Sequence, residues 1–364
     1  MNRHQFLLAF SCASVLTLSA FTLPNKTLDD RDTPYLTKKF SGGISAVRAE
    51  TSGGSLTVEG GSGKEARVEM YVHPNNWNGR NNLDKDELED RLKDYDISIA
   101  KEGSTLVATV KRRNNNSNDR ATDRWQRSLS ISFKFFTPRN VTTDLRTSGG
   151  SIHLSALTGN QRFRTSGGSL HLNDIEGSVN GQTSGGSIHA DRIRQTESDG
   201  GIDLQTSGGS IEATASSGKL RLHTSGGSIK LADLKGDVDA QTSGGSVQGN
   251  NIDGDIKAST SGGSVRLANV AGSLDASTSA GSVEVSLTKL GEYVRLNTSA
   301  GSIRVNMPLN KGMDLNLSGN RVNLPDNLSR FEGNVEKDRV RGKLNGGGIA
   351  VNMTANSGSV SINR

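Results

Sequence analysis

The stretch Thr165-Ser166-Gly167-Gly168-Ser169 is one copy of a motif that recurs along the chain and decides its fold. Full Thr-Ser-Gly-Gly-Ser copies begin at Thr51, Thr147, Thr165, Thr183, Thr206, Thr224, Thr242 and Thr260, and softened Thr-Ser-Ala-Gly-Ser copies begin at Thr278 and Thr298. From Thr147 to Thr278 the copies are 18 residues apart, except for one step of 23. A fixed period of this size predicts a stacked repeat architecture.

Each period contains two short stretches in which polar and apolar residues alternate. The first follows the motif at Ser169–Leu172, and the second lies at Ser178–Gly181, just after the turn glycine Gly177. Alternation with a period of two, bounded by Gly and Asn or Asp, predicts a β-strand. Each period is therefore expected to form two short strands and two turns.

Equivalent positions keep their character from copy to copy. The residue after the motif is always aliphatic: Ile152, Leu170, Ile188, Ile211, Ile229, Val247, Val265, Val283 and Ile303. One period cannot bury its own apolar face, whereas stacked periods bury a continuous strip. The sequence therefore predicts an all-β chain forming a parallel, β-helix-like solenoid with about 18 residues per coil, in which Thr and Ser columns form hydrogen bonds along the stack.

Changes in the pattern divide the chain into five parts. We expect a signal peptide at 1–20, a linker at 21–39, an N-terminal β region at 40–146, the repeat array at 147–305, and C-terminal coils with a cap at 306–364. The N-terminal region should contain a short helix near Leu83–Leu92 and a hairpin that turns at Gly103. Solenoids need atypical ends, which is the reason for the expected cap.

The first 20 residues, MNRHQFLLAFSCASVLTLSA, predict export. A short apolar run from Phe6 to Leu18 follows Arg3 and precedes the small residues Ser19 and Ala20. This pattern is typical of a secretory signal rather than of a membrane span, so we expect a location in the periplasm or at the cell surface and no transmembrane segment after cleavage. Lipidation of Cys12, which is the only cysteine, is the alternative.

Three histidines are the candidates for a metal site. His153, His171 and His189 occupy the same outward position in successive copies, and stacked imidazoles could share a zinc or copper ion. The favoured alternative is an exposed polar column, because the next members are Glu212 and Lys230. We therefore expect no metal and no other cofactor.

A basic run gives a second candidate. Residues 101–146 hold ten Lys and Arg against four Asp and Glu, in a chain of net charge +5. The candidate binding residues are Arg112, Arg113, Arg120, Arg124, Trp125 and Arg127. Basic residues beside an aromatic fit nucleic acid in general. Export argues against nucleic acid as the partner, so an anionic envelope polymer or lipid surface is the more favoured ligand for this run. The simplest interpretation is that the run is a solvated loop that binds nothing.

Catalysis is not expected. The chain has no Gly-x-Ser-x-Gly motif, no metalloprotease motif and no recurring pair of carboxylates, and only Phe163 and Tyr293 are aromatic between residues 147 and 305. Polysaccharide lyases and hydrolases built on β-helices need clustered charged groups, and sugar subsites favour aromatic rings. A polysaccharide-active enzyme is therefore the least favoured alternative.

The leader, the N-terminal β region, Pro138 at a strand end and the run Leu145–Ile152 together resemble the bacterial putative-adhesin family. The resemblance covers roughly residues 40–364 and implies a solenoid of the cell envelope, with no catalytic residues to transfer. It implies a non-enzymatic, adhesin-like scaffold that binds an envelope or extracellular polymer or a surface protein. An envelope-stress or regulatory interaction protein is the alternative.

Overall fold

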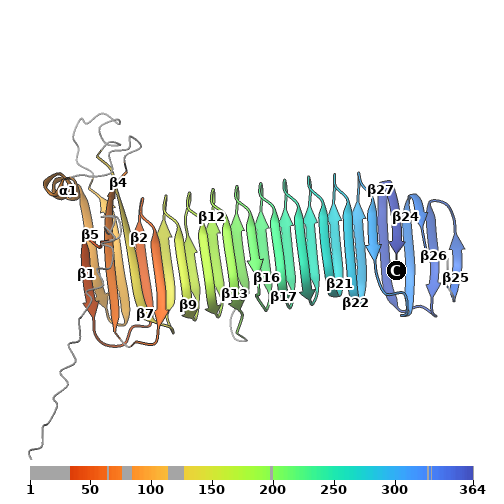
Figure 1. Cartoon of the computed structure of the whole chain (residues 1–364), viewed down its shortest axis with the longest axis horizontal. Helices are drawn as coiled ribbons and strands as arrows, with labels where there is room; N and C mark the ends of the chain where they lie inside the picture. Colours follow the sequence, from red (N-terminus) through yellow and green to blue (C-terminus); the bar gives the residue numbers. More distant parts are fainter. Residues whose placement is uncertain are drawn as a thin grey trace, which may run out of the picture. The chain divides into compact units, whose positions relative to one another are not determined.

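The structure is a computed structural model that describes residues 33–63, 65–75, 84–113, 127–196, 200–325, 328 and 330–363. The predicted signal peptide lies outside the described residues. Residues Pro34–Arg364 form one compact unit. Its described part consists of strands and one helix, α1 (Lys85–Leu92), as Figure 1 shows.

The strands follow one another closely along the chain. Before the array they are β1 (Leu36–Phe40), β2 (Ala46–Thr51), β3 (Leu56–Gly61), β4 (Ala66–Pro74), β5 (Tyr95–Glu102), β6 (Thr105–Arg112) and β7 (Leu129–Pro138). The array contains β8 (Thr142–Thr147), β9 (Ile152–Thr158), β10 (Gln161–Arg164), β11 (Leu170–Glu176), β12 (Val179–Thr183), β13 (Ile188–Arg194), β14 (Ile202–Thr206), β15 (Ile211–Thr214), β16 (Leu220–Thr224), β17 (Ile229–Lys235), β18 (Val238–Thr242), β19 (Val247–Asp253), β20 (Ile256–Thr260), β21 (Val265–Thr278), β22 (Val283–Thr298) and β23 (Ile303–Asn306). The last four are β24 (Met313–Asn323), β25 (Phe331–Val335), β26 (Arg339–Leu344) and β27 (Ile349–Asn363).

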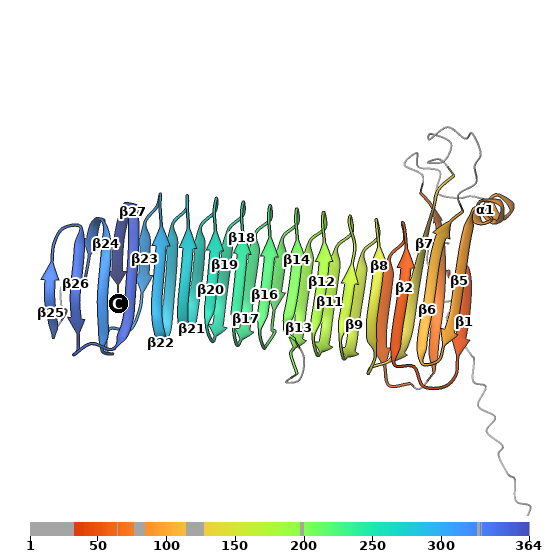
Figure 2. The same ribbon diagram turned by 180° about the vertical axis from the view of Figure 1, so that it is seen from behind.

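Successive coils stack in register as parallel strands. Leu170 on β11 pairs with Ile152 on β9 and with Ile188 on β13. On the other side of the coil, β10 pairs with β8 and β12 in the same way. Figures 1 and 2 show the resulting ladder from opposite sides. The predicted all-β parallel solenoid is confirmed.

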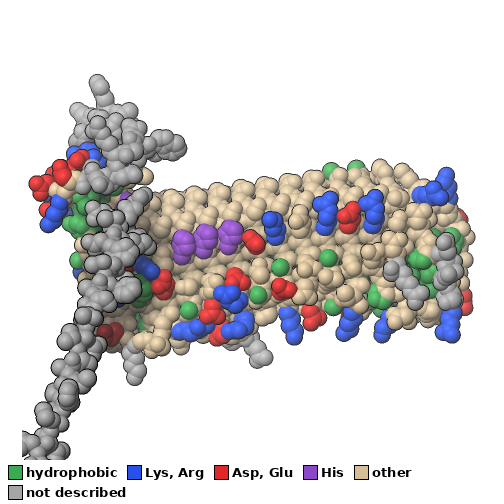
Figure 3. Space-filling view, in the orientation of Figure 1, with side chains coloured by type: hydrophobic (Ala, Val, Ile, Leu, Met, Phe, Trp, Pro, Cys, Tyr) green, Lys and Arg blue, Asp and Glu red, His purple; other side chains and the backbone are tan. Residues whose placement is uncertain are grey.

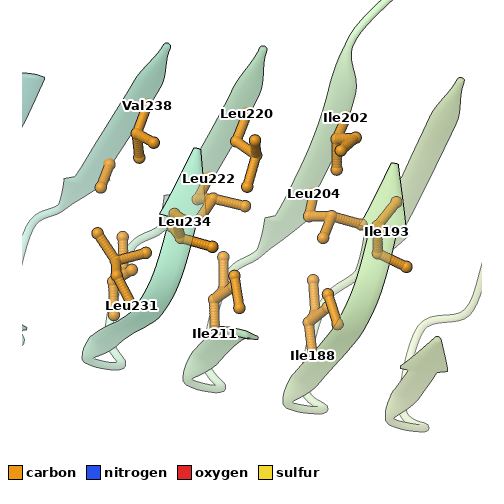
Figure 4. Packing of buried hydrophobic residues seen from close by; sticks show 14 of the residues in the cluster. Ile188, Ile193, Ile202, Leu204, Ile211, Leu220, Leu222, Leu231, Leu234 and Val238 are labelled. Carbon is orange, nitrogen blue, oxygen red and sulfur yellow. The ribbon is translucent and has the colours of Figure 1, made fainter. Parts of the chain in front are cut away.

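The core lies between the two walls of the coil. The residues that follow the motif, such as Ile152, Leu170 and Ile188, are fully buried, and Figure 4 shows how the aliphatic side chains of neighbouring coils fill the interior. Burial of this kind contributes about 25 cal/mol per Å² of apolar surface removed from water, which is the main stabilising term for the stack.

The core also has a third buried column, which the alternation did not predict as a column. Its members include Leu157, Ile175 and Ile193, all fully buried. Each follows a residue in the left-handed conformation, for example Asp174 with φ of 53°. A left-handed residue interrupts the alternation of a strand, so the next side chain returns to the interior.

The Thr-Ser-Gly-Gly-Ser motif forms one corner of every coil. The Thr hydroxyl donates to the second Gly carbonyl of the preceding coil, as Thr165 Oγ1 does to Gly150 O at 2.8 Å. The closing serine accepts from the next coil's backbone, as Ser151 Oγ does from the Ser169 N–H at 3.2 Å. The predicted Thr and Ser columns therefore bond to neighbouring backbone, rather than mainly to one another.

The second motif glycine is required by the closeness of the stack. A Cβ added to Gly168 would lie 2.0 Å from the carbonyl oxygen of Gly150 in the coil before it. Such a distance is impossible for two non-bonded atoms, and the neighbour is backbone that cannot move alone. Only glycine fits at this corner.

Both ends of the array depart from chain order. The first coil, β2 and β3, pairs directly with β8 and β9, although nearly a hundred residues separate the two motif copies. At the other end, β27 pairs with β22 and β23 on one side and with β24 on the other. Of the intervening strands, β6 and β7 continue the stack beyond the first coil as parallel partners of β2 and β3. Antiparallel pairs occur only towards the two ends of the described chain, for example β1–β4, β5–β6 and β24–β26.

The predicted helix and hairpin are both present. Helix α1 begins after Asp84, whose side chain accepts a 2.8 Å hydrogen bond from the Glu87 N–H. Its Leu88 and Leu92 are partly buried against the core, while Leu83 lies outside the described residues. Strands β5 and β6 form the hairpin, and Gly103 turns it with φ of 60°.

Candidate binding groove

The three candidate histidines lie together on one outer face. We call this the histidine face and define it as the outward side of β9, β11, β13, β15, β17, β19, the first parts of β21 and β22, and β23. His171 pairs in register with His153 and His189. The ring centroids are 4.6 and 5.1 Å apart, and the rings are nearly parallel. Figure 3 shows them as a continuous row.

The surroundings of His153 and His171 favour neutral imidazoles. Burial, and then the charge of His171, lower the pKa of His153, although Glu59 opposes the shift. Burial, and then His189, lower the pKa of His171. At the end of the row, His189 Nδ1 lies 3.4 Å from Glu212 Oε2.

The geometry does not favour a shared metal ion. Zinc needs ligand nitrogens about 2.0–2.1 Å away that converge on one point. In stacked rings the lone pairs lie in parallel planes, so they do not converge. Among the residues that the structure describes, no three His, Cys, Asp or Glu side chains are grouped to hold a metal.

The histidine row continues into a charged row along the same face. After Glu212 come Lys230, Gln248, Arg266, Glu284 and Arg304, each in register with the next. Two ion pairs converge on Glu284, from Arg266 at 3.3 Å and from Arg304 at 2.9 Å. From Lys230 onward the row holds three cations, Lys230, Arg266 and Arg304, and one acid, Glu284, so this part of it carries an excess of positive charge.

A groove of about 780 Å³ lies beside this charged row. Its other side is a row of small or amide side chains: Asn250, Ala268, Ser286, Asn306 and Asn363. Gly249 lies between the two rows, at an inward position that holds Leu231 and Leu267 in the adjacent coils. Because its rows run from coil to coil, the groove follows the direction in which the coils stack.

The groove has the chemistry of a binding surface rather than of a catalytic centre. Cations and amide groups can bind carboxylates and hydroxyls through hydrogen bonds. Glu284 is the only carboxylate among the described residues that line the groove, and two arginines hold it, so it is poorly suited to act as a general base. The same described lining contains no aromatic side chain, so polar contacts must provide the affinity.

A C-terminal part of the chain, somewhat less than half of it, matches a known family model. Residues 202–363 match the family model described as Toastrack DUF4097. This Toastrack segment contains the whole groove, from Lys230 to Asn363, whereas the histidine row precedes it. None of the curated proteins matches the chain.

Three solved structures are similar to the chain. A putative cell adhesion protein from Clostridium sporogenes is 9% identical, with 91% of this chain and 99% of that one covered and a TM-score of 0.17. A putative adhesin from Bacteroides fragilis is 12% identical (90% and 96% covered, TM-score 0.25). A putative lipid binding protein from Parabacteroides distasonis is also 12% identical (90% and 96% covered, TM-score 0.31). Likeness at this level carries no conclusion about function.

The structure describes three of the six candidate residues of the predicted basic run, and these three do not line the groove. Arg120, Arg124 and Trp125 lie outside the described residues. Arg113 Nε lies 2.6 Å from Asp96 Oδ1, and Arg127 contacts Asp90 at 3.0 Å and Asp94 at 3.7 Å. The guanidinium of Arg112 lies 5.9 Å from the centre of the Tyr95 ring.

The groove itself was not predicted from the sequence. The signal for it was present, because the residue two places after each motif forms an outward column in any stacked solenoid. In the sequence, that column stands out only at its three histidines and the two residues that follow them.

Among the described residues, no helix is long and apolar enough to cross a membrane.

Proposed function

We propose that this protein is an exported, non-enzymatic scaffold of the cell envelope that binds an acidic polysaccharide along the groove beside Arg266. In this proposal the regular 18-residue coil sets the spacing of the binding groups, and residues 306–364 cap the stack. The predicted signal peptide at 1–20 supports export to the periplasm or the cell surface.

The observation that carries the proposal is the continuity of the groove across successive coils. Lys230, Arg266 and Arg304 are exposed on one side, and amide side chains face them on the other. An extended polymer can contact equivalent groups in each coil, and its many weak contacts add along its length. A carboxylated chain fits best, because the row beside the groove holds three cations and only one acid, Glu284.

The carboxylate of Glu284 is already partly neutralised by ion pairs within the protein. Glu284 bridges Arg266 and Arg304, so it holds both guanidinium groups in place at the edge of the groove. Each arginine has five N–H donors, and a single shared carboxylate leaves donors available for a ligand. The bridge therefore orients the arginines without satisfying them.

The proposal is tested by binding of polygalacturonate, a soluble carboxylated polysaccharide, to the protein by isothermal titration calorimetry. A triple variant, Lys230→Ala with Arg266→Ala and Arg304→Ala, should bind about tenfold more weakly or worse, because exposed charge pairs contribute up to ~1 kcal/mol each. Binding should also weaken as salt is raised from about 0.1 to 1 M.

A matched control removes the same charge from the other side of the coil. The control is a second triple variant, Lys219→Ala with Arg221→Ala and Lys257→Ala. These three residues belong to the opposite wall of the coil and line different hollows. This control should bind like the unmodified protein. Equal loss in both triple variants would show that net charge rather than the groove matters, and no loss in the first would refute the proposal.

A further inference from the structure

A second hollow lies on the opposite outer face, which we call the arginine face: the outward side of β8, β10, β12, β14, β16, β18 and β20. The hollow measures about 350 Å³ and lies over β8, β10 and β12. Three arginines line it, Arg146 on β8 and Arg162 and Arg164 on β10. All three side chains are exposed.

Two of these arginines are placed directly beside each other. Arg164 pairs in register with Arg146 on the neighbouring parallel strand, so their Cα atoms are ~4.8 Å apart. On the far side of Arg164 lies the neutral Gln182, and on the far side of Arg146 lies Glu50. Like charges in directly paired positions destabilise a sheet.

The carboxylates nearby do not neutralise this group. Among the described residues that line the hollow, Asp144 is the only acid, and its Oδ1 lies 3.6 Å from Arg146 Nε. The third arginine, Arg162, pairs in register with Asp144 on one side and with Asn180 on the other. Three arginines against one aspartate leave the hollow with an excess of two positive charges.

The arginines of the hollow differ from those of the groove in the charge of their neighbours. There, Arg266 and Arg304 flank Glu284 in the row, so each has an acid within 3.3 Å. In the hollow, Arg164 has an arginine on one side and an amide on the other. The floor is rigid, because Leu145 and Phe163 between the arginines are fully buried in the core.

We propose that the hollow formed by Arg146, Arg162 and Arg164 is a binding site for a phosphate group. Guanidinium forks match the oxygens of phosphate and bind them through paired N–H donors. The amide NH2 groups of Asn180 and Gln182, at the edge of the same hollow, supply further donors. A bound dianion removes the repulsion between Arg146 and Arg164.

The test compares two variants of the full chain, Arg164→Gln and Arg221→Gln, by thermal unfolding and by calorimetric titration with inorganic pyrophosphate. The control residue Arg221 is exposed on β16 of the same face and lines neither the hollow nor the groove. Without ligand, Arg164→Gln should leave the melting temperature unchanged or raise it, since it removes a like-charge neighbour. Pyrophosphate should raise the melting temperature of the unmodified protein and of Arg221→Gln, because a ligand stabilises the folded state it binds. It should bind Arg164→Gln at least about tenfold more weakly.

The source of the phosphate is distinguished with a second pair of probes. Vesicles of phosphatidylglycerol in phosphatidylcholine report a lipid headgroup, and pyrophosphate reports a free or polymer-borne phosphate. Loss of binding to either probe in Arg164→Gln, with binding retained in Arg221→Gln, supports the site. Equal binding by both variants, or no binding to either probe by the unmodified protein, overturns it. Since the hollow and the groove are on opposite faces, failure here leaves the proposed function untouched.

Discussion

The hydroxyl of Thr165 donates a 2.8 Å hydrogen bond to the carbonyl of Gly150 in the preceding coil. The same hydroxyl accepts a 3.2 Å hydrogen bond from the Gly168 N–H in its own turn. One side chain therefore closes its own corner and ties it to its neighbour. Thr183, Thr224 and Thr242 repeat the inter-coil contact at 2.7 Å. This repetition explains why the motif has threonine at its first position.

Replacement of Thr165 by valine should destabilise the protein by about 1–3 kcal/mol, because it leaves a buried carbonyl and a buried N–H without their partner. Valine keeps the shape of the side chain, so packing changes little. Chemical denaturation measures the effect. The control is Ser166→Ala in the same motif, whose side chain is exposed and which should change the free energy of unfolding by less than about 0.5 kcal/mol. Equal effects of the two changes would contradict this role.

Gly181 should be required for stability because a large side chain, that of Phe163, packs directly against it. A Cβ at Gly181 would lie 2.3 Å from Phe163 Cε2 and 3.0 Å from Leu204 Cδ2. Gly181→Ala should therefore cost about 1–3 kcal/mol through overpacking. Thermal or chemical unfolding measures this cost.

Two further variants separate crowding from a general effect of alanine. Gly43→Ala adds a methyl group where nothing lies within 4 Å, and it should leave stability the same or raise it slightly. Combining Gly181→Ala with Phe163→Leu should cost less than the two single changes together, because the smaller side chain makes room. Strict additivity would show that the two residues do not compete for the same space.

The histidine row should make the protein less stable in acid. Burial, and then a neighbouring histidine, lower the pKa of both His153 and His171 in the folded chain below the usual value of 6.5. Between the folded and unfolded pKa values the unfolded chain binds more protons, so stability rises with pH there. The contribution is complete above about pH 6.5 and is lost as pH falls through the folded pKa values.

Melting temperatures measured between pH 4 and 8 check this expectation. His171→Gln removes the middle ring and should flatten the fall between about pH 6.5 and 5, because it also separates His153 from His189. His223→Gln is the control, since His223 lies on β16 outside the row. If the two variants respond to pH in the same way, the stacked row is not responsible.

Much of the stack could be predicted because its causes are local and repeat. The aliphatic residue after each motif, such as Leu170, and the turn glycine, such as Gly177 with φ of 131°, are visible in any single period. The third buried column could not be predicted from alternation. Ile175 faces inward only because Asp174 adopts a left-handed conformation, and aspartate does not require that conformation.

The arrangement at the two ends and the groove depend on which segments become neighbours. That β27 lies between β23 and β24 is decided by pairing between distant parts of the chain, which periodicity does not encode. The groove lies between two outward columns of side chains that run from coil to coil, with Gly249 between them. The histidine row was predicted because three identical residues recur, whereas Lys230, Arg266 and Arg304 differ in type and are not consecutive members of their column.

The central claim is that an acidic polysaccharide lies along the groove, and its dependence on ligand length is the most direct test. The groove crosses six paired strands, from Lys230 to Asn363, and is therefore roughly 24 Å long. Affinities should be measured by calorimetry for galacturonate oligomers of increasing length. Affinity should rise with each added unit until the groove is filled and then level off. A dimer that binds as tightly as the longest oligomer would show that the ligand does not lie along the groove.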